Sequence, residues 1–352
     1  MSTRDETIHV NASELMSLIL PERDNGRVRV FITGATGFVG SAIVRALARE
    51  GAEIHALVRP TADCSALDCL PIIWHEGDVN TPLRLNGVVA NMTYVIHAAG
   101  RLGEAGLPEQ IYERTNVDGT RNVLAAAMGG KDMPRVLHVS SPGVLGPIGG
   151  DPATEDAPLA PSNSYERSKA AAEGVAHEFI SRGLPVIIAR PEFIYGPGDR
   201  HVLGLFRAVL RRHFFYIDGG RHFCHPTFVG DAVDGMLLCL SRGQTGHTYH
   251  ITGPRPVTFR ELAETIASAL GVPPPRFNVP RLLALAGASG LEAWGKLVGG
   301  KPQLSRTAVA FFSEDRRFSW QKAHSDLGYS PQHDIASGIS LTSQWYRKRG
   351  WL

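Results

Sequence analysis

A glycine-rich turn near the start of the sequence limits the fold more than any other stretch: Thr33-Gly34-Ala35-Thr36-Gly37-Phe38-Val39-Gly40. The apolar run directly before it predicts a buried strand, and apolar residues directly after it recur at helical spacing. Gly34 permits a tight turn, Gly37 lets the backbone approach a pyrophosphate, and Gly40 allows close packing of the helix. Together these features predict the first βαβ unit of a dinucleotide-binding fold, with phosphates at the helix N-terminus.

Beyond this turn, predicted strands alternate with predicted helices, which is typical of a doubly wound α/β sheet with mostly parallel strands. The predicted strands are 53–58, 72–74, 94–99, 135–139 and 185–189, and the predicted helices are 110–128 and one that begins near Tyr165. After residue 191 the alternation gives way to helical patterns at 201–212, 228–242, 258–270 and 280–298. We therefore expect an N-terminal arm at 1–26, a dinucleotide-binding domain at 27–191, and a smaller, mainly helical substrate lobe at 192–352. Parts of this lobe are expected to return to the main sheet.

Composition narrows the classes of partner. Of the 352 residues, 43% are apolar and 20% charged, so the chain can bury a large core. The formal net charge is only +2, which gives no electrostatic case for binding nucleic acid. No apolar run is long enough to span a bilayer. The cysteines (Cys64, Cys69, Cys224 and Cys239) lack metal-ligand spacing, so we expect a reduced, cytoplasmic protein without a metal site.

The end of the second predicted strand bears on the choice of cofactor. An NAD-specific site places Asp or Glu about twenty residues after the glycine motif, where it binds the ribose 2′-hydroxyl. This sequence has Arg59 there, and a guanidinium can bind a 2′-phosphate. We therefore predict that NADP(H) is favoured over NAD(H). The alternative is that Arg59 is a solvated strand-end residue and that Asp63 or another group contacts the ribose.

Three residues suit hydride-transfer chemistry. Tyr165 and Lys169 lie four residues apart, so on a helix they share one face. An ammonium near a phenol lowers its pKa toward the working range, which favours proton exchange. Ser141, at the end of the fifth predicted strand, can donate a hydrogen bond to a carbonyl oxygen as charge builds on it. We predict that Tyr165 is the general acid or base, Lys169 tunes it and binds the ribose, and Ser141 polarises the carbonyl.

Taken together, these motifs resemble the extended short-chain dehydrogenase/reductase family, also called the NAD-dependent epimerase/dehydratase family. The glycine motif, Asn116, Ser141 and the Tyr165-x-x-x-Lys169 pair carry the resemblance. The resemblance covers about residues 27–350, because it continues through the segments 190–191, 195–199, 225–231, 322–323, 327–329 and 345–346. It implies a Rossmann domain that binds NADP over 27–191, a C-terminal substrate lobe and a Ser-Tyr-Lys site. It also implies a homodimer formed through helices 110–128 and 165–182.

The resemblance further implies which residues surround the cofactor. Asp78 and Val79 would lie near the adenine, Ala98, Ala99 and Gly100 along the cofactor path, and Pro191 and Phe193 near the nicotinamide. Asn116 would be a structural support. From the glycine motif, the expected cofactor contacts are Gly34, Thr36, Gly37, Phe38, Val39 and Gly40. Arg59 and Lys169 complete this set, and Glu192 and Arg221 are candidate substrate contacts.

Within the family, the residues after Ser141 argue against one branch. The sugar-nucleotide dehydratases carry an Asp-Glu pair there, whereas this sequence has Pro142 and Gly143, which cannot move protons. Sugar-nucleotide epimerases remain an alternative, because Arg221 matches the arginine with which they bind a diphosphate. Against them, the Asn that usually follows the sixth strand is replaced by 191–193, and the usual Arg-Pro-Gly-Asp element is absent.

The segment 281–299 is rich in leucine and suggests two interpretations. It could form an apolar lid over a hydrophobic substrate, as in the 3β-hydroxysteroid dehydrogenase-like and dihydroflavonol reductase-like branches, or a helix packed on its own lobe. His97, His138 and His250 sit in strand patterns and are expected to be packed or hydrogen-bonded rather than metal ligands. The pair Arg316-Arg317 is expected to be solvated.

The sequence thus predicts an NADP(H)-dependent oxidoreductase that reduces a ketone or aldehyde, or oxidises the corresponding secondary alcohol. Its partner is expected to be a small carbonyl or alcohol substrate. A nucleotide-sugar epimerase with bound NAD is the first alternative. A non-catalytic NADP-binding regulator is the second, although binding alone does not require a phenol four residues before a lysine.

Overall fold

The computed structural model describes residues 28–352 apart from 82–85, 90–91, 105, 131 and 299–304. The arm predicted for residues 1–26 lies outside the described residues. Within the described ranges, no helix combines the length and hydrophobicity that crossing a lipid bilayer requires.

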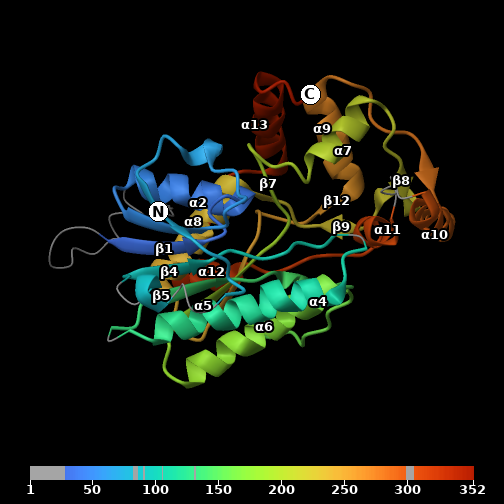
Figure 1. The fold of residues 1–352 in the computed structure, drawn as a ribbon. Helices are drawn as coiled ribbons and strands as arrows, with labels where there is room; N and C mark the ends of the chain where they lie inside the picture. Colours follow the sequence, from blue (N-terminus) through green and yellow to red (C-terminus); the bar gives the residue numbers. More distant parts are fainter. Residues whose placement is uncertain (1–27, 82–85, 90–91, 105, 131, 299–304) are drawn as a thin grey trace, which may run out of the picture.

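In the described part of the chain, a seven-stranded sheet forms the centre of the molecule (Figure 1). The strands are β1 (Arg29–Thr33), β2 (Glu53–Val58), β3 (Ile72–Glu76), β4 (Tyr94–His97), β5 (Arg135–Val139), β6 (Val186–Pro191) and β11 (Thr248–Ile251). They lie in the order β11-β6-β5-β4-β1-β2-β3, and each neighbouring pair is parallel. The predicted doubly wound, parallel sheet is confirmed. Its strand order reverses between β1 and β4, and ligands bind at the carboxyl ends of such a pair.

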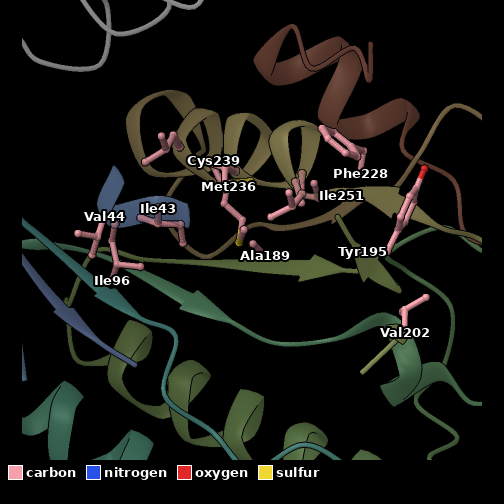
Figure 2. Close-up of a cluster of buried hydrophobic side chains, with 14 of the residues drawn as sticks. Ile43, Val44, Ile96, Ala189, Tyr195, Val202, Phe228, Met236, Cys239 and Ile251 are labelled. Carbon is pink, nitrogen blue, oxygen red and sulfur yellow. The ribbon is translucent and has the colours of Figure 1, made fainter. Parts of the chain in front are cut away.

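Helices cover both faces of this sheet (Figure 1). One face carries α2 (Phe38–Arg49) and α8 (Val229–Arg242), and the other carries α5 (Gly119–Met128) and α6 (Ser164–Ser181). Successive strand residues point to opposite faces, so Ile32 packs in the first layer and Phe31 in the second. Figure 2 shows the first layer, where α2 and α8 meet the sheet through Ile43, Val44, Ile96, Ala189, Met236, Cys239 and Ile251. This core fixes α2, and the glycine turn before it, relative to the strand ends.

The C-terminal part is mainly helical, and its helices gather at one end of the molecule (Figure 1). They are α7 (Leu203–Leu210), α9 (Phe259–Leu270), α10 (Arg281–Val298), α11 (Arg306–Phe312) and α13 (Ile335–Lys348). Short strand pairs join them: β7 (Ile194–Tyr195) with β10 (Thr227–Phe228), β9 (Phe223–Cys224) with β12 (Val257–Thr258), and β8 (Tyr216–Ile217) with β13 (Asn278–Val279). In contrast, β11 and α8 belong to the central sheet and its covering layer, and α12 (Gln321–Leu327) packs beside them.

The leucine-rich helix α10 packs on its lobe mainly through its small residues. Ala284 and Ala288 are buried in a cluster with Ile217 and Val309. Leu285 packs against the same cluster, whereas other large side chains point outward, with Leu282 79% and Trp294 63% exposed. The helix therefore packs on its lobe through its alanines and Leu285, as one of the two interpretations expected, whereas Leu282, Leu283, Leu291 and Trp294 are exposed.

Candidate active site

The glycine turn lies against the carboxyl end of β4, where the strand order reverses. Gly34 has a φ of +76°, and a Cβ there would come within 2.8 Å of the backbone of Ala98 and Ala99. A Cβ at Gly40 would overlap the Gly34 carbonyl oxygen, so α2 packs directly on the turn. Gly37 is the N-cap of α2 and provides no side-chain hydrogen bond to it. Because the N-cap leaves the first N–H groups of α2 without a side-chain partner, the turn fits a dinucleotide's pyrophosphate.

Other residues predicted to contact the cofactor follow strands that end at the same edge of the sheet. Arg59 follows β2 and its side chain is exposed. Asp78 follows β3, and its carboxylate accepts a hydrogen bond from Asn80 N at 2.9 Å. Val79 is buried against Gly119 at the start of α5. Because parallel strands present their carboxyl ends at one edge, residues distant in sequence are brought to the same edge of the sheet.

The helix predicted at 110–128 contains a π-helical turn, Glu113–Asp118, between α4 (Glu109–Tyr112) and α5. Asn116 lies in this turn and is 2% exposed. Its Oδ1 accepts from Arg101 N at 2.7 Å, and its Nδ2 donates to the Arg101 carbonyl at 3.1 Å and to the Ser168 hydroxyl at 2.8 Å. These bonds tie the loop after β4 to α6, which is the contact expected of a structural support.

Ser141, Tyr165 and Lys169 meet at the carboxyl end of β5. Ser141 begins the 3₁₀ turn Pro142–Leu145, and its Oγ accepts a hydrogen bond from Gly143 N at 3.1 Å. Tyr165 lies in the first turn of α6, close enough to Ser141 for that hydroxyl to lower the pKa of the phenol. Lys169 follows one turn later, and its Nζ donates to the Val139 carbonyl at 2.6 Å.

The pKa of Tyr165 shifts opposite to expectation. Burial raises it above the ordinary value, the Ser141 hydroxyl lowers it, and the charges of Glu192 and Glu166 raise it further. Burial also lowers the pKa of Lys169 to about 8. The expectation that Lys169 acidifies Tyr165 is therefore wrong in this structure, because its ammonium is hydrogen-bonded to Val139 and burial dominates. The phenol stays protonated at neutral pH.

A constrained loop after β6 carries Glu192, which is 6% exposed. Its N–H donates to the Ile251 carbonyl at 3.1 Å, and its carbonyl accepts from Thr227 Oγ1 at 2.6 Å. The next residue, Phe193, has a φ of +36°, which is uncommon for a bulky side chain. Pro191 ends β6 just before this loop, and Glu192 lies close enough to Tyr165 for its charge to raise the pKa of the phenol.

Arg316 is a site residue that the sequence did not reveal. The prediction of solvated charge is wrong for it, because it is only 9% exposed. Its Nη2 lies 2.8 Å from Glu166 Oε1 and 3.3 Å from Glu314 Oε2. A Cβ at Gly143 would lie 3.4 Å from Arg316 Nη1, so the guanidinium packs directly beside Gly143. No local pattern could have found this contact, since Arg316 and Gly143 are distant in the sequence.

Arg221, the other candidate substrate contact, is not brought into this cluster. It is exposed and follows the 3₁₀ turn Asp218–Gly220. Within the described residues, no hydrogen bond or ion pair joins its side chain to Ser141, Tyr165 or Arg316.

Comparisons with known proteins agree with this geometry. The profile of the NAD dependent epimerase/dehydratase family matches residues 30–252. A 4-hydroxy-2-methyl-3-oxo-4-farnesyl-3,4-dihydroquinoline-1-oxide ketoreductase from Stigmatella aurantiaca is 30% identical over 90% of this chain and 96% of its own. A 2-alkyl-3-oxoalkanoate reductase from Stenotrophomonas maltophilia is 26% identical over 89% of this chain and 97% of its own.

A solved structure extends the likeness to the whole fold. A dTDP-glucose 4,6-dehydratase from Streptomyces venezuelae, crystallised with NAD, superposes with a TM-score of 0.75 and 26% identity over 92% of this chain and 98% of its own. The profile match covers well over half of the chain, and the site lies where doubly wound sheets bind nucleotides. The chain belongs to the NAD-dependent epimerase/dehydratase family and is an NAD(P)-dependent enzyme of the extended short-chain dehydrogenase/reductase type.

Proposed function

We propose that this enzyme uses NADP(H) to reduce a ketone or aldehyde to an alcohol, or runs the reverse oxidation. The observation that carries the proposal is the meeting of Ser141, Tyr165 and Lys169 at the carboxyl end of β5, where Ser141 begins the following turn and Lys169 Nζ donates to the Val139 carbonyl at 2.6 Å. Two hydroxyls at the same strand end can both act on one carbonyl oxygen. Similarity to two reductases of ketones supports the same chemistry.

The cofactor is held by the glycine turn and by the strand ends in this proposal. Residues 34–40 bind the pyrophosphate, Ala98 to Gly100 line the path, and Lys169 reaches the ribose. Arg59 supports NADP(H), because an exposed guanidinium follows β2 where an NAD site carries a carboxylate. Asp63, the alternative ribose contact, is engaged locally, since its carboxylate accepts from Ser65 N at 3.0 Å.

The chain's own residues supply the proton for this reduction. When bound, the cofactor supplies hydride to the carbonyl carbon. Tyr165 gives its phenolic proton to the carbonyl oxygen, and the raised pKa of Tyr165 keeps that proton in place until negative charge builds. Ser141 Oγ already accepts from Gly143 N, so its own hydrogen is available to the same oxygen. The products are the alcohol and the oxidised cofactor, with Tyr165 left to regain one proton from solvent.

Neighbouring residues favour reduction over the other reactions of the family. Elimination of water needs an added acid and base, yet Pro142 and Gly143 carry none. Glu166, which is close by, is already paired with Arg316 and accepts two hydrogen bonds from Ser162. The epimerase alternative with bound NAD rested on Arg221, whose side chain lies exposed and outside the cluster.

The names of the two reductase relatives suggest a substrate class. One is named for a ketone with a hydroxyl on the adjacent carbon, and the other for a 3-oxoalkanoate. Both compounds carry a second oxygen one or two carbons from the keto carbon. We propose that the substrates of the present enzyme belong to the same class, carbonyl compounds with a nearby second oxygen.

The test is reduction of a panel of ketones with NADPH, followed through the absorbance of the reduced nicotinamide. We expect Tyr165→Phe to lower kcat by about 10²- to 10⁴-fold, since it removes the acid, while NADPH binding measured by calorimetry persists. Tyr112→Phe is the matched control, because Tyr112 packs against Tyr165 but its hydroxyl bonds only the backbone of Glu104 among the described residues.

Two outcomes would contradict this proposal. The first is a protein that purifies with NAD and isomerises a UDP-sugar without net redox, which indicates the epimerase. The second is an absence of turnover together with partner binding that Tyr165→Phe leaves unchanged, which indicates a regulator.

A further inference from the structure

Glu192 differs from the other carboxylates of the site in having no partner for its carboxyl group. Glu166 accepts from the N–H and the hydroxyl of Ser162 and pairs with Arg316. The Glu192 carboxyl makes no hydrogen bond or ion pair with any residue that the structure describes, although the residue is only 6% exposed. Unlike the enclosed ring nitrogens of His138, the carboxyl oxygens of Glu192 are not fully enclosed, so a ligand can reach this largely buried group and supply the missing partner.

The charges around Glu192 favour its neutral form. The ionisable groups that face it are Tyr165 and Glu166 on α6, Cys224 on β9, and Arg316 after α11. Among these described groups Arg316 is the cation, and both Glu166 and Glu314 already pair with it. This one cation is therefore shared among three carboxyl groups, Glu192 included, and offsets a charge on Glu192 only in part. Burial raises the pKa of Glu192 to about 7, with Arg316 opposing and Glu166 adding to the rise.

Hydrogen bonds fix the backbone from which the Glu192 side chain extends. The N–H and carbonyl of Glu192 are both hydrogen-bonded, to Ile251 and Thr227. Phe193 is kept at a positive φ by Thr227 N, which donates to its carbonyl at 3.1 Å. Strained residues of this kind persist where the surroundings over-determine them, and they cluster at functional sites. The carboxyl is close enough to Tyr165 for its charge to affect the phenol.

We propose that Glu192 is a specificity-determining residue that, as a neutral carboxylic acid, donates a hydrogen bond to a second oxygen of the substrate. That oxygen is carried on the carbon next to the reacting carbonyl or one carbon further. The inference rests on the proposed reduction and explains its selectivity. A site built to hydrogen-bond a substrate oxygen rejects analogues that lack it, because its own buried group is then left unpaired.

The experiment compares ethyl acetoacetate with the alkyl ketone of the same chain length, using NADPH and a series of pH values. In the wild type we expect kcat/KM for ethyl acetoacetate to fall about tenfold per pH unit above the pKa of Glu192, since the donor is lost on ionisation. Glu192→Gln keeps a neutral donor, so this fall should disappear while activity stays within about tenfold. Glu192→Leu should lose about 10- to 100-fold on ethyl acetoacetate and leave the alkyl ketone unchanged.

Asp234→Asn is the matched control. Burial also raises the pKa of Asp234, to about 6, but this residue lies on α8, and its charged neighbours are Asp231 and His333. Its replacement should leave the pH profile and the substrate preference unchanged. As a measurement independent of turnover, the infrared difference spectrum between wild type and Glu192→Gln should show a protonated carboxyl band at pH 6 that is lost by pH 8.

The outcomes separate the two proposals. If the wild type reduces both ketones but Glu192→Leu changes neither the preference nor the pH profile, the role of Glu192 is overturned and the reduction stands. The absence of the protonated carboxyl band would also overturn the role of Glu192, and this measurement applies even if Glu192→Leu fails to fold. If the wild type reduces neither these nor other ketones, the proposed reduction itself fails.

Discussion

At the carboxyl end of β5, Tyr165 and Lys169 lie one helical turn apart. Lys169 nevertheless does not lower the pKa of Tyr165 as their spacing predicts. Lys169 hydrogen-bonds the Val139 carbonyl, and burial raises the pKa of Tyr165. Arg316 shows the same dependence on surroundings, since an arginine from a charged doublet is buried between two glutamates. At this scale, the chemistry of a side chain follows from what surrounds it as much as from its type.

Arg59→Ala tests the cofactor preference. If the guanidinium binds the 2′-phosphate, its loss removes a hydrogen bond to a charged group, worth about 1.5–3 kcal/mol. The KM for NADPH should then rise about 10- to 100-fold, with little change for NADH. Arg29→Ala is the control. It makes the same change in charge, but Arg29 begins β1 and so lies at the opposite edge of the sheet, and its loss should change the KM of neither cofactor. An equal loss for both cofactors in Arg59→Ala would contradict the 2′-phosphate role.

At the scale of the element, the glycine turn and α2 behave as one unit. The turn brings the N-terminus of α2 to the crevice because Gly40 lets the helix lie directly on the Gly34 carbonyl. Buried residues such as Ile43 and Val44 then hold the helix on the sheet (Figure 2). The position of the phosphate-binding N–H groups therefore depends on packing that a single methyl group can disturb.

Gly40→Ala and Gly174→Ala make the same chemical change on two helices. A Cβ at Gly40 has no room, so overpacking should lower the free energy of unfolding by about 1–3 kcal/mol and weaken NADPH binding. A Cβ at Gly174 in α6 meets nothing within 4 Å. The higher helix propensity of alanine should therefore raise the free energy of unfolding by up to about 1 kcal/mol. Urea unfolding and cofactor titration measure both effects, and equal stability of the two variants would contradict the packing account.

At the scale of the whole molecule, the central sheet buries ionisable groups as well as apolar ones. The rings of His97 and His138 lie 5.6 Å apart within the sheet. His97 is hydrogen-bonded to the hydroxyls of Thr33 and Thr120, at 2.7 and 3.0 Å. Neither ring nitrogen of His138 has a hydrogen-bond partner among the described residues. Packing is thus as expected for His97 and His138, but only His97 is also hydrogen-bonded.

This burial predicts that the protein loses stability in mild acid. Burial lowers the pKa of His97 and His250 to about 3 and of His225 to about 4, and lowers that of His138 well below its usual value. The unfolded chain therefore binds more protons than the native state below about pH 6.5, so unfolding is favoured as pH falls. Four described carboxyl groups whose pKa values burial raises act in the opposite direction: Glu155, Glu192, Asp199 and Asp234. They are fewer than the described histidines whose pKa burial lowers, because His75 adds a fifth.

We expect the free energy of unfolding to fall between about pH 6.5 and pH 4, by about 1.4 kcal/mol per pH unit for each net proton taken up. Urea unfolding across this range measures the slope. His97→Gln keeps a neutral hydrogen-bonding group between Thr33 and Thr120 and should reduce the slope by about one proton. A stability that is unchanged or higher at pH 5 than at pH 7 would contradict this prediction.

The sequence by itself determined the local elements and their order. The strands predicted at 53–58 and 135–139 are β2 and β5 with the same bounds, and the glycine turn leads into α2 as expected. It also placed Ser141, Tyr165 and Lys169 near one sheet edge. This succeeds because apolar periodicity and turn residues act over a few positions, and parallel strands end at a common edge.

Only the tertiary structure decided what the site contains beyond those residues. It brought Arg316 beside Gly143, turned Asn116 inward through a π-helical turn, and added β11 to the sheet. It also decided that Glu192 is buried without a partner among the described residues, and that Tyr165 has a raised pKa. The physical reason is that burial and ion pairing depend on contacts between segments distant in the chain, which no local spacing contains.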